Sequence, residues 1–363
     1  MNNTNELGSE NFSLYSMNKE EKNVFINSKL KFLFNHHISK SLNYKKMMKS
    51  IGYDIKNITS IENFPYLPVR LFKLHELKSV ESSQIIKTMT SSGTTGQQVS
   101  KIYIDKLTSV IQTKVLSKIM SSFIGKSRAP MIIIDSEETV KNRKKFSART
   151  AGILGFSMFG SRKVFALNND MTLNYERVND FVKQNIDKSI LVFGFTSIIY
   201  QHFYKELVKN NLKLDLSNGI IIHGGGWKKL INLAVDSKTF KQNLKSVCNI
   251  KRIHDYYGMV EQTGSIHMEC EDGYLHTSEY SDILIRGFKD FEVLDNGKEG
   301  VIQLISLIPL SYPGHSILTE DIGYIVGEDN CSCGRKGKYF KITGRIKKAE
   351  IRGCSDTYTN GKI

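Results

Sequence analysis

Hydrophobic residues in the first third of the chain recur at helical spacing. Between Phe25 and Ile38 they fall three to four residues apart, which predicts helix over residues 20–50. A second helix is predicted over residues 106–121. Residues 64–69 read Phe-Pro-Tyr-Leu-Pro-Val, and each proline disfavours helix at the residue before it. Extended backbone is therefore expected there.

The middle of the chain carries three short apolar runs, each of the kind found in a buried parallel strand. They cover residues 129–135, 189–194 and 218–223. A helical pattern through Tyr200 and Leu207 follows the second run, and three glycines follow the third. Strands that alternate with helices predict an α/β sheet that binds ligands at the carboxyl ends of its strands.

After about residue 265 the pattern becomes that of antiparallel β-structure. Short strands are predicted over residues 281–286, 291–294 and 301–305, and Asp295-Asn296-Gly297 is a turn signal between the last two. The chain therefore changes from an α/β part to a β-rich part.

Composition places the chain among ordinary globular proteins. It has 363 residues, of which 40% are hydrophobic and 24% charged. No apolar run approaches the roughly 18 residues that would predict a membrane span. The first ten residues are polar and acidic, unlike a secretory signal. These features predict a cytoplasmic enzyme of one large domain or two.

The net charge of +15 raises the question of nucleic-acid binding. Only 11 of the 51 basic residues are arginine, however, and the 40 lysines are scattered along the chain. Nucleic-acid readers favour arginine for bidentate contacts. A solvated basic surface is therefore expected, without a nucleic-acid partner.

Two pairs of potential metal ligands stand out among the cysteines. Cys270 and His276 form a Cys-x5-His pair, and Cys331 and Cys333 form a Cys-x-Cys pair followed by the turn residue Gly334. Four such ligands suit a closed tetrahedral zinc site that cross-links the β-rich part and takes no part in catalysis. The alternative is two unlinked sets of free cysteines. Further candidate ligands are His267 and Glu269.

A loop rich in hydroxyls and glycine has the composition of a phosphate-binding loop, since backbone N–H groups and hydroxyls can surround phosphate oxygens. It is not a Walker loop, because Gln97 follows its last glycine. Alternating residues on both sides predict a hairpin that holds the loop, whereas the alternative is a flexible surface loop. The expected phosphate-binding residues are Thr90, Ser91, Ser92, Gly93, Thr94, Thr95 and Gly96.

Residues 90–96 resemble the phosphate-binding motif of the adenylate-forming enzymes, which activate carboxylic acids with ATP, and four further motifs of that superfamily follow in order. Gly224, Gly225 and Gly226 resemble its adenine-side turn. In residues 254–261 the resemblance implies that Tyr257 stacks on adenine and that Glu261 holds Mg²⁺ near the α-phosphate. Residues 319–321 resemble the motif whose acid, here Asp321, binds the ribose, and residues 343–345 resemble the hinge motif, with Arg345 as a catalytic residue.

The resemblance implies an α/β fold: an adenylate-forming large domain of two α/β subdomains and a β-rich subdomain. That domain is expected over residues 1–343, with the β-rich part at roughly 265–343. Residues 344–363 are then a hinge and a short C-terminal tail. Only 18 residues follow Arg345, so the small C-terminal domain that carries the superfamily's catalytic lysine is expected to be absent or vestigial. Either another lysine, from the tail or from a partner, serves instead, or the chain is truncated.

Residues 11–14, 64–73 and 347–354 together resemble the acyl-protein synthetases of bacterial luminescence, the luciferin-component ligases. That family implies activation of a long-chain fatty acid as acyl-AMP and transfer through a cysteine, here Cys354, to an acyl reductase. Residues 257–261 and 331–335 look more like the phenylacetate–CoA ligases, which leaves an acyl- or aryl-CoA ligase as the alternative. A third possibility is a non-catalytic subunit that senses adenylate or acts as a scaffold.

Cys354 lies in a tail too short to bury a thiol. Lys347, Lys348 and Arg352 favour its thiolate, whereas Asp356 opposes it. The alternative is an ordinary exposed tail cysteine. By the same resemblance, the acid substrate should bind along residues 193–196 and beside the strand that ends at His223.

Overall fold

The computed structural model describes residues 10, 12–91, 98–141 and 148–346 of the chain. The described residues form two compact units. The first unit comprises residues 10, 12–91, 98–123 and 258–346. The second comprises residues 124–141 and 148–257.

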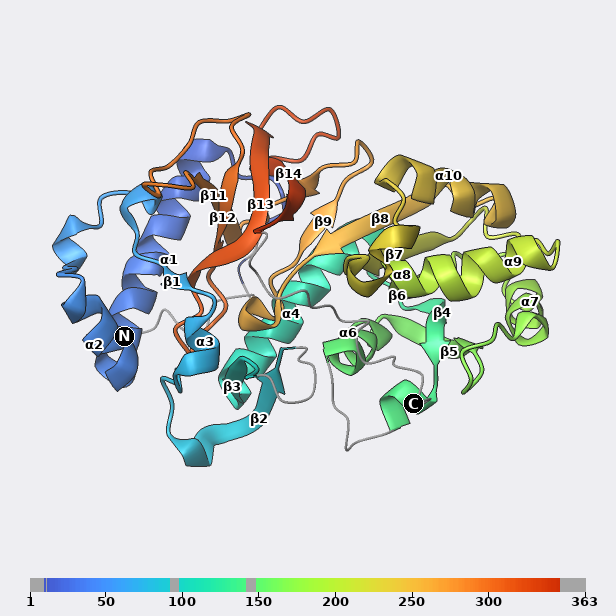
Figure 1. The fold of residues 1–363 in the computed structure, drawn as a ribbon, viewed down its shortest axis with the longest axis horizontal. Helices are drawn as coiled ribbons and strands as arrows, with labels where there is room; N and C mark the ends of the chain where they lie inside the picture. The colour runs from blue at the N-terminus through green and yellow to red at the C-terminus, as the bar shows by residue number, and fades with distance from the viewer. Residues whose placement is uncertain (1–9, 11, 92–97, 142–147, 347–363) are drawn as a thin grey trace. The chain divides into compact units, whose positions relative to one another are not determined.

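The second unit is a parallel sheet in the order β8-β7-β6-β4-β5, with helices between successive strands (Figure 1). This confirms the predicted α/β arrangement. Its elements are β4 (Ala129–Ser136), α5 (Glu138–Lys141), α6 (Ala148–Ser157), β5 (Gly160–Leu167), α7 (Tyr175–Lys183), β6 (Leu191–Phe195), α8 (Thr196–Ile198), the π-helix η5 (Ile199–Tyr204), α9 (Lys205–Lys209), β7 (Ile220–Gly224), the 3₁₀-helix η6 (Lys228–Leu233), α10 (Ser237–Cys248) and β8 (Arg252–Tyr257).

The central strands of this sheet are buried along their length. Residues 131–134 of β4 and 191–193 of β6 are fully inaccessible to solvent, as expected for strands covered on both faces. The edge strand β5 is different, because Arg162 and Lys163 are exposed and interrupt its apolar pattern. That interruption explains why apolar runs alone did not predict β5.

The first unit contains an antiparallel sheet in the order β11-β12-β13-β14-β10-β9, which confirms the predicted β-rich part. Its strands are β9 (His267–Glu269), β10 (Leu275–His276), β11 (Ser281–Arg286), β12 (Gly300–Ser306), β13 (Ser316–Glu328) and β14 (Lys338–Arg345). The strand predicted at residues 291–294 is wrong, because only an isolated bridge joins Val293 to Arg286. Phe291, at the start of that segment, has a positive φ of 58°, which is incompatible with a strand.

The helix predicted over residues 20–50 is two helices. α1 (Lys19–Lys40) begins at Asn18, which forms a capping box with Glu21. Ser41 then has extended backbone and caps α2 (Leu42–Ser50) through its side chain. The helix predicted over 106–121 is α4 (Lys106–Ile124). No helix in the described part of the chain has the length and hydrophobicity needed to span a membrane.

The extended segment predicted at residues 64–69 contains β1 (Leu67–Pro68), which pairs in parallel with Ile317–Leu318 of β13. The backbone N–H of Val69 continues this pairing by donating to the carbonyl of Leu318 at 2.9 Å. The short helix α3 (Leu71–Leu74) follows directly. This pairing joins the N-terminal region to β13, 250 residues away in the sequence.

The predicted hairpin around the hydroxyl-rich loop is present as β2 (Ile85–Thr90) and β3 (Lys101–Asp105). Two hydrogen bonds join the strands at the base of the loop. The N–H of Ser91 donates to the carbonyl of Ser100 at 3.2 Å, and the N–H of Ser100 donates to Oγ of Ser91 at 2.9 Å. The ends of the loop are therefore held at a fixed separation.

Candidate active site and metal centre

Glu261 occupies a buried position in the first unit. It lies in the 3₁₀-helix η7 (Val260–Gln262), and only 5% of the residue is exposed. Burial raises the pKa of its carboxyl, whereas the Ser100 hydroxyl and the charges of Lys73 and Arg345 lower that pKa. A buried carboxylate in such a position can hold a cation, because a bound positive charge offsets the cost of its burial.

Ser100, at the base of the hydroxyl-rich loop, is one of the groups that lower the pKa of the Glu261 carboxyl. Thr90 and Ser91 lie in the same unit as Glu261. The rest of the expected phosphate-binding loop lies outside the described residues: Ser92, Gly93, Thr94, Thr95 and Gly96. Ser100 is a functional candidate that the motif comparison missed, because it follows the motif and lies directly before β3.

Gln262, next to Glu261, fixes this helix against the adjoining loop. Its side-chain amide donates to the carbonyl of Gly314 at 2.8 Å and to that of Leu304 at 3.2 Å. A Cβ at Gly314 would lie 2.8 Å from the carbonyl oxygen of Glu261, so a side chain would not fit there. The loop around Gly314 therefore determines the position of Glu261.

The fourth motif, at residues 319–321, lies on β13 opposite the hinge motif on β14. Asp321 pairs with Arg345 across the two strands, and the Asp321 Oδ1 atom is 3.8 Å from the Arg345 Nε atom. Arg345 Nη2 also donates to Glu320 Oε2 at 2.9 Å. Both predicted residues are therefore in one charged cluster.

Glu320 is the acid that the motif comparison missed. It accepts hydrogen bonds from Arg345 and from Arg70, which immediately precedes α3. The two guanidinium groups lower the pKa of Glu320 against the opposing effect of its burial. No local pattern predicts this contact, because Arg70 and Glu320 meet only through the pairing of β1 with β13.

In the second unit, the predicted adenine-side glycines lie at the carboxyl end of the sheet. Gly224 ends β7 and pairs with Tyr256 on β8, and Tyr257 is the last residue of β8. A Cβ at Gly224 would lie 2.5 Å from the Tyr256 ring. Gly225 has a φ of +79°, which favours glycine. Gly226 follows them and is exposed. The structure thus brings the glycine turn and the tyrosine strand together.

The region expected to bind the acid substrate is partly filled by packed rings. Phe193 stacks on Phe156 with centroids 4.2 Å apart, and Phe195 is 2% exposed. Thr196 Oγ1 lies 2.9 Å from His223 Nδ1. Burial lowers the pKa of His223 to about 3, so its imidazole is neutral at physiological pH. Thr196 and His223 are polar groups in this region, and His223 Nδ1 also lies 3.6 Å from Asp255 Oδ1.

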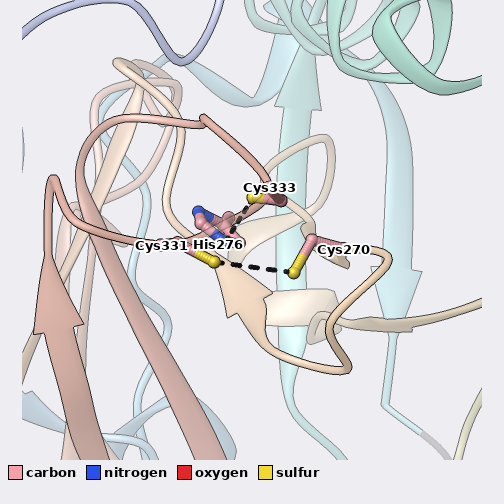
Figure 2. A group of neighbouring side chains, drawn as sticks. All are labelled: Cys270, His276, Cys331 and Cys333. Atoms are coloured by element: carbon pink, nitrogen blue, oxygen red, sulfur yellow. Dashed lines mark hydrogen bonds between the residues drawn. The ribbon is translucent and has the colours of Figure 1, made fainter.

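The four predicted zinc ligands converge in the first unit (Figure 2). Their ligand atoms all lie within 4.8 Å of one another. Cys270 Sγ is 4.0 Å from Cys331 Sγ, and Cys333 Sγ is 3.5 Å from His276 Nε2. Tetrahedral ligands at a Zn–S distance of about 2.3 Å are about 3.8 Å apart, so the set fits zinc. His267 and Glu269 are not members of this cluster.

Tight turns present these ligands. Cys270 follows β9, His276 ends β10, and the Cys331–Cys333 turn joins β13 to β14. Gly334 has a φ of +81° and donates its N–H to the carbonyl of Cys331 at 3.0 Å, as the predicted turn requires.

The electrostatics of the cluster without a metal favour neutral ligands. Burial raises the pKa of Cys331 to about 12 and lowers the pKa of His276 to about 4. A bound Zn²⁺ would stabilise the cysteine thiolates and so reverse the preference of the cysteines for the neutral thiol. The histidine needs no such change, because the neutral imidazole is the form that binds Zn²⁺.

The remaining predicted site residue, Cys354, lies outside the described residues, as do its neighbours Lys347, Lys348, Arg352 and Asp356. Its role therefore stays a prediction.

The two units have the fold of the adenylate-forming CoA ligases. The solved 2-hydroxyisobutyryl-CoA ligase, in an open conformation with an acyl-AMP and CoA, matches with a TM-score of 0.72 at 15% identity. That match covers 92% of this chain and 77% of the ligase chain. A second structure of that ligase, in the thioesterification state, gives a TM-score of 0.70 at 16% identity and covers 92% of this chain and 70% of the other.

Within this fold, the chain belongs to the acyl-protein synthetase family, LuxE, whose model matches residues 7–362. This confirms the resemblance drawn from the sequence. A long-chain-fatty-acid–luciferin-component ligase of Aliivibrio fischeri is 26% identical over 317 residues, which cover 84% of this chain and 80% of that protein. The ligase of the same name from Vibrio harveyi is 22% identical over 360 residues, covering 93% and 88%.

Proposed function

We propose that this protein activates a long-chain fatty acid with ATP as acyl-AMP and passes the acyl group to its own Cys354 for delivery to an acyl reductase. The family and the names of its relatives support the substrate class. The observation that carries the proposal is the charged cluster in the first unit, where Arg345 lies 3.8 Å from Asp321 and acts on the pKa of the buried Glu261 carboxyl.

In the first step, a carboxylate oxygen of the fatty acid attacks the α-phosphorus of ATP. The bond from that phosphorus to the bridging β-phosphate oxygen breaks, and pyrophosphate leaves. Glu261 offers the hard oxygen ligand that Mg²⁺ prefers, and the ion supplies charge neutralisation at the phosphates when bound. The hydroxyls and backbone N–H groups of residues 90–96 would bind the phosphate oxygens.

In the second step, the Cys354 thiolate attacks the acyl carbonyl carbon. A thioester forms and AMP leaves with the electron pair of the broken carbon–oxygen bond. The thioester is the form in which an acyl group can be handed to a reductase partner. An acyl-CoA ligase would use the thiol of CoA in place of Cys354.

Both steps can be tested on the full chain. Fatty-acid-dependent exchange of labelled pyrophosphate into ATP should require Mg²⁺. Incubation with ATP, Mg²⁺ and labelled fatty acid should label the protein, and neutral hydroxylamine should release that label. Cys354→Ser should abolish labelling and retain exchange, whereas Cys248→Ser should label like the wild type, because Cys248 is fully buried.

Three results would contradict this proposal. Absence of exchange would favour the non-catalytic alternative. Label that persists in Cys354→Ser would move the acceptor to another residue. Label that appears only on added CoA would make the protein a CoA ligase.

We further propose that Cys270, His276, Cys331 and Cys333 bind one structural zinc ion. Their spacing and mutual distances support this. All four positions of a tetrahedral ion would be occupied by protein, so no position would remain for a substrate or water. Zinc would cross-link the β9–β10 region to the β13–β14 turn.

Metal analysis of the purified protein should find about one zinc per chain. Cys333→Ser should lose the metal and lower the melting temperature, whereas Ser332→Ala, in the same turn, should retain it. Metal-free protein that melts at the temperature of the zinc-loaded protein would contradict the proposal.

A further inference from the structure

The helix α2 of the first unit has a basic outer face. It packs beside α1 (Figure 1), and Tyr44 and Met48 are buried on the side that holds it there. The opposite side of α2 consists of four exposed residues that recur at helical spacing: Leu42, Lys45, Lys46 and Lys49. Three positive charges and one apolar side chain therefore share one exposed face.

Neighbouring acids do not balance the charge of this face. The 32 residues from 22 to 53 contain seven lysines and neither aspartate nor glutamate. Within the described part of the chain, the three lysines of the face form no ion pair. Glu76 adjoins α2, where its carbonyl accepts from the Asn43 amide, but its carboxylate pairs with Lys78. Asp54, the first acid after the segment, accepts a backbone N–H.

Large apolar side chains lie at both ends of the same helix. Leu42 begins α2 and is 65% exposed, and Ile51, which follows α2, is 62% exposed. One exposed leucine is ordinary in a globular protein, but here lysines separate two such side chains. Lysines at the level of the phosphates, with apolar side chains below them, are how basic amphipathic helices bind anionic membrane surfaces. A nucleic acid would use the lysines and leave both apolar side chains in water.

We propose that α2 is a docking surface for an anionic phospholipid bilayer. In this contact the three ammonium groups lie among the lipid phosphates, and Leu42 and Ile51 enter the boundary between headgroups and acyl chains. The helix is already folded and held by its buried side, so docking pays no cost of helix formation. Docking requires neither ATP nor a fatty acid, so it goes beyond the proposed function and can be measured separately from it.

Cosedimentation of the full chain with lipid vesicles tests this surface. The protein should bind phosphatidylcholine vesicles that contain phosphatidylglycerol, and should bind vesicles of phosphatidylcholine alone much more weakly. High salt should reduce the binding, because it screens the attraction between lysines and phosphates. The triple variant Lys45→Gln, Lys46→Gln and Lys49→Gln should bind about 100-fold more weakly, since each lysine near an anionic surface contributes about fivefold to the affinity.

A second triple variant is the matched control for net charge: Lys183→Gln, Lys188→Gln and Lys209→Gln. Its three lysines are exposed in the second unit, so it loses the same charge away from α2 and should bind vesicles like the wild type. Leu42→Gln tests the apolar contact and should weaken binding about tenfold, the scale of burying one leucine side chain. All variants should melt at the wild-type temperature, because the substituted side chains are exposed.

Equal loss of vesicle binding in the two triple variants would overturn the proposal, because it would indicate a response to net charge alone. Equal binding to vesicles with and without phosphatidylglycerol would also overturn it. The third overturning result is binding to duplex DNA that the α2 triple variant loses, with no binding to vesicles, since it would make this face a nucleic-acid surface.

Discussion

Acidification should destabilise the first unit through His315, which lies just before β13 in the loop that supports Glu261. The His315 ring stacks on His37 of α1, with centroids 4.8 Å apart and planes 7° apart, and its Nε2 atom is 3.2 Å from the Tyr44 hydroxyl. Burial lowers the pKa of His315 to about 3, and the nearby His36 adds to this effect. The neutral imidazole is therefore the form that fits the fold.

The size of the effect follows from linkage. An unfolded histidine has a pKa of about 6.5, so the unfolded chain binds a proton at His315 before the folded chain does. The stabilising contribution is present above pH 6.5 and is lost as the pH falls from 6.5 toward 3. Between pH 7 and pH 5, the difference in proton binding costs about 2 kcal/mol from this residue alone.

His315→Phe keeps a ring in the stack and removes the titrating group. Loss of the contact with Tyr44 should cost about 1 kcal/mol at pH 7. Between pH 7 and pH 5, however, the variant should lose about 2 kcal/mol less stability than the wild type. Hydrogen exchange of the α1 and α2 amides measures this free energy within the first unit, whereas Trp227 fluorescence reports on the second unit.

The exposed His75 provides the matched control, so His75→Phe should show the wild-type dependence on pH. An equal loss of stability in the wild type and His315→Phe between pH 7 and pH 5 would refute the reasoning. Since Gly314 precedes His315 and accepts from Gln262, pyrophosphate exchange should decline over the same pH range.

Three further predictions concern single side chains. Glu261→Gln should reduce the rate of pyrophosphate exchange by roughly 10²–10³-fold. It should not lower the melting temperature, because a neutral amide is easier to bury than a carboxylate, and unchanged exchange would remove Glu261 from the site. Gly224→Ala places a Cβ 2.5 Å from the Tyr256 ring, so thermal melting should show a loss of about 1–3 kcal/mol in the free energy of unfolding. ATP titration should show weaker binding, and unaltered ATP affinity would argue against this turn as the adenine site. Asp135→Asn leaves the Arg149 guanidinium buried without its bidentate carboxylate partner. Urea unfolding followed by Trp227 fluorescence should show that the free energy of unfolding falls by about 3–5 kcal/mol, and a loss below about 1 kcal/mol would contradict this account of the pair.

Local sequence signals predicted those parts of the molecule that local interactions determine. The apolar runs of β4, β6 and β7 are buried on both faces, so their residue types alone identify them. The zinc cluster was predictable because each ligand pair is close in sequence and Gly334 signals the turn. The break at Ser41 was missed because the apolar spacing continues across it, although serine is a preferred capping residue.

The charged cluster around Glu320 depends on contacts that no local pattern contains. Arg70 reaches it through a strand of only two residues, which pairs with a strand 250 residues further along the chain. Asp321 was predicted from its motif, but Glu320 beside it makes the contacts with both arginines. Motif order identifies the strand that carries the acids, and only the tertiary pairing shows which basic residues face them.

Two paired strands also connect the proposed zinc site to the charged cluster at Asp321. β13 and β14 form one antiparallel hairpin, with Glu328 opposite Lys338 near the Cys331–Cys333 turn and Asp321 opposite Arg345 at the other end. Asp321 and Glu328 are seven residues apart on β13, which is about 23 Å at strand spacing. The ladder contains two irregularities, so its hydrogen bonds alone hold the register weakly. A metal that fixes the turn would also fix which residue of β14 faces Asp321, and a structural zinc can in this way support adenylation without touching a reacting atom.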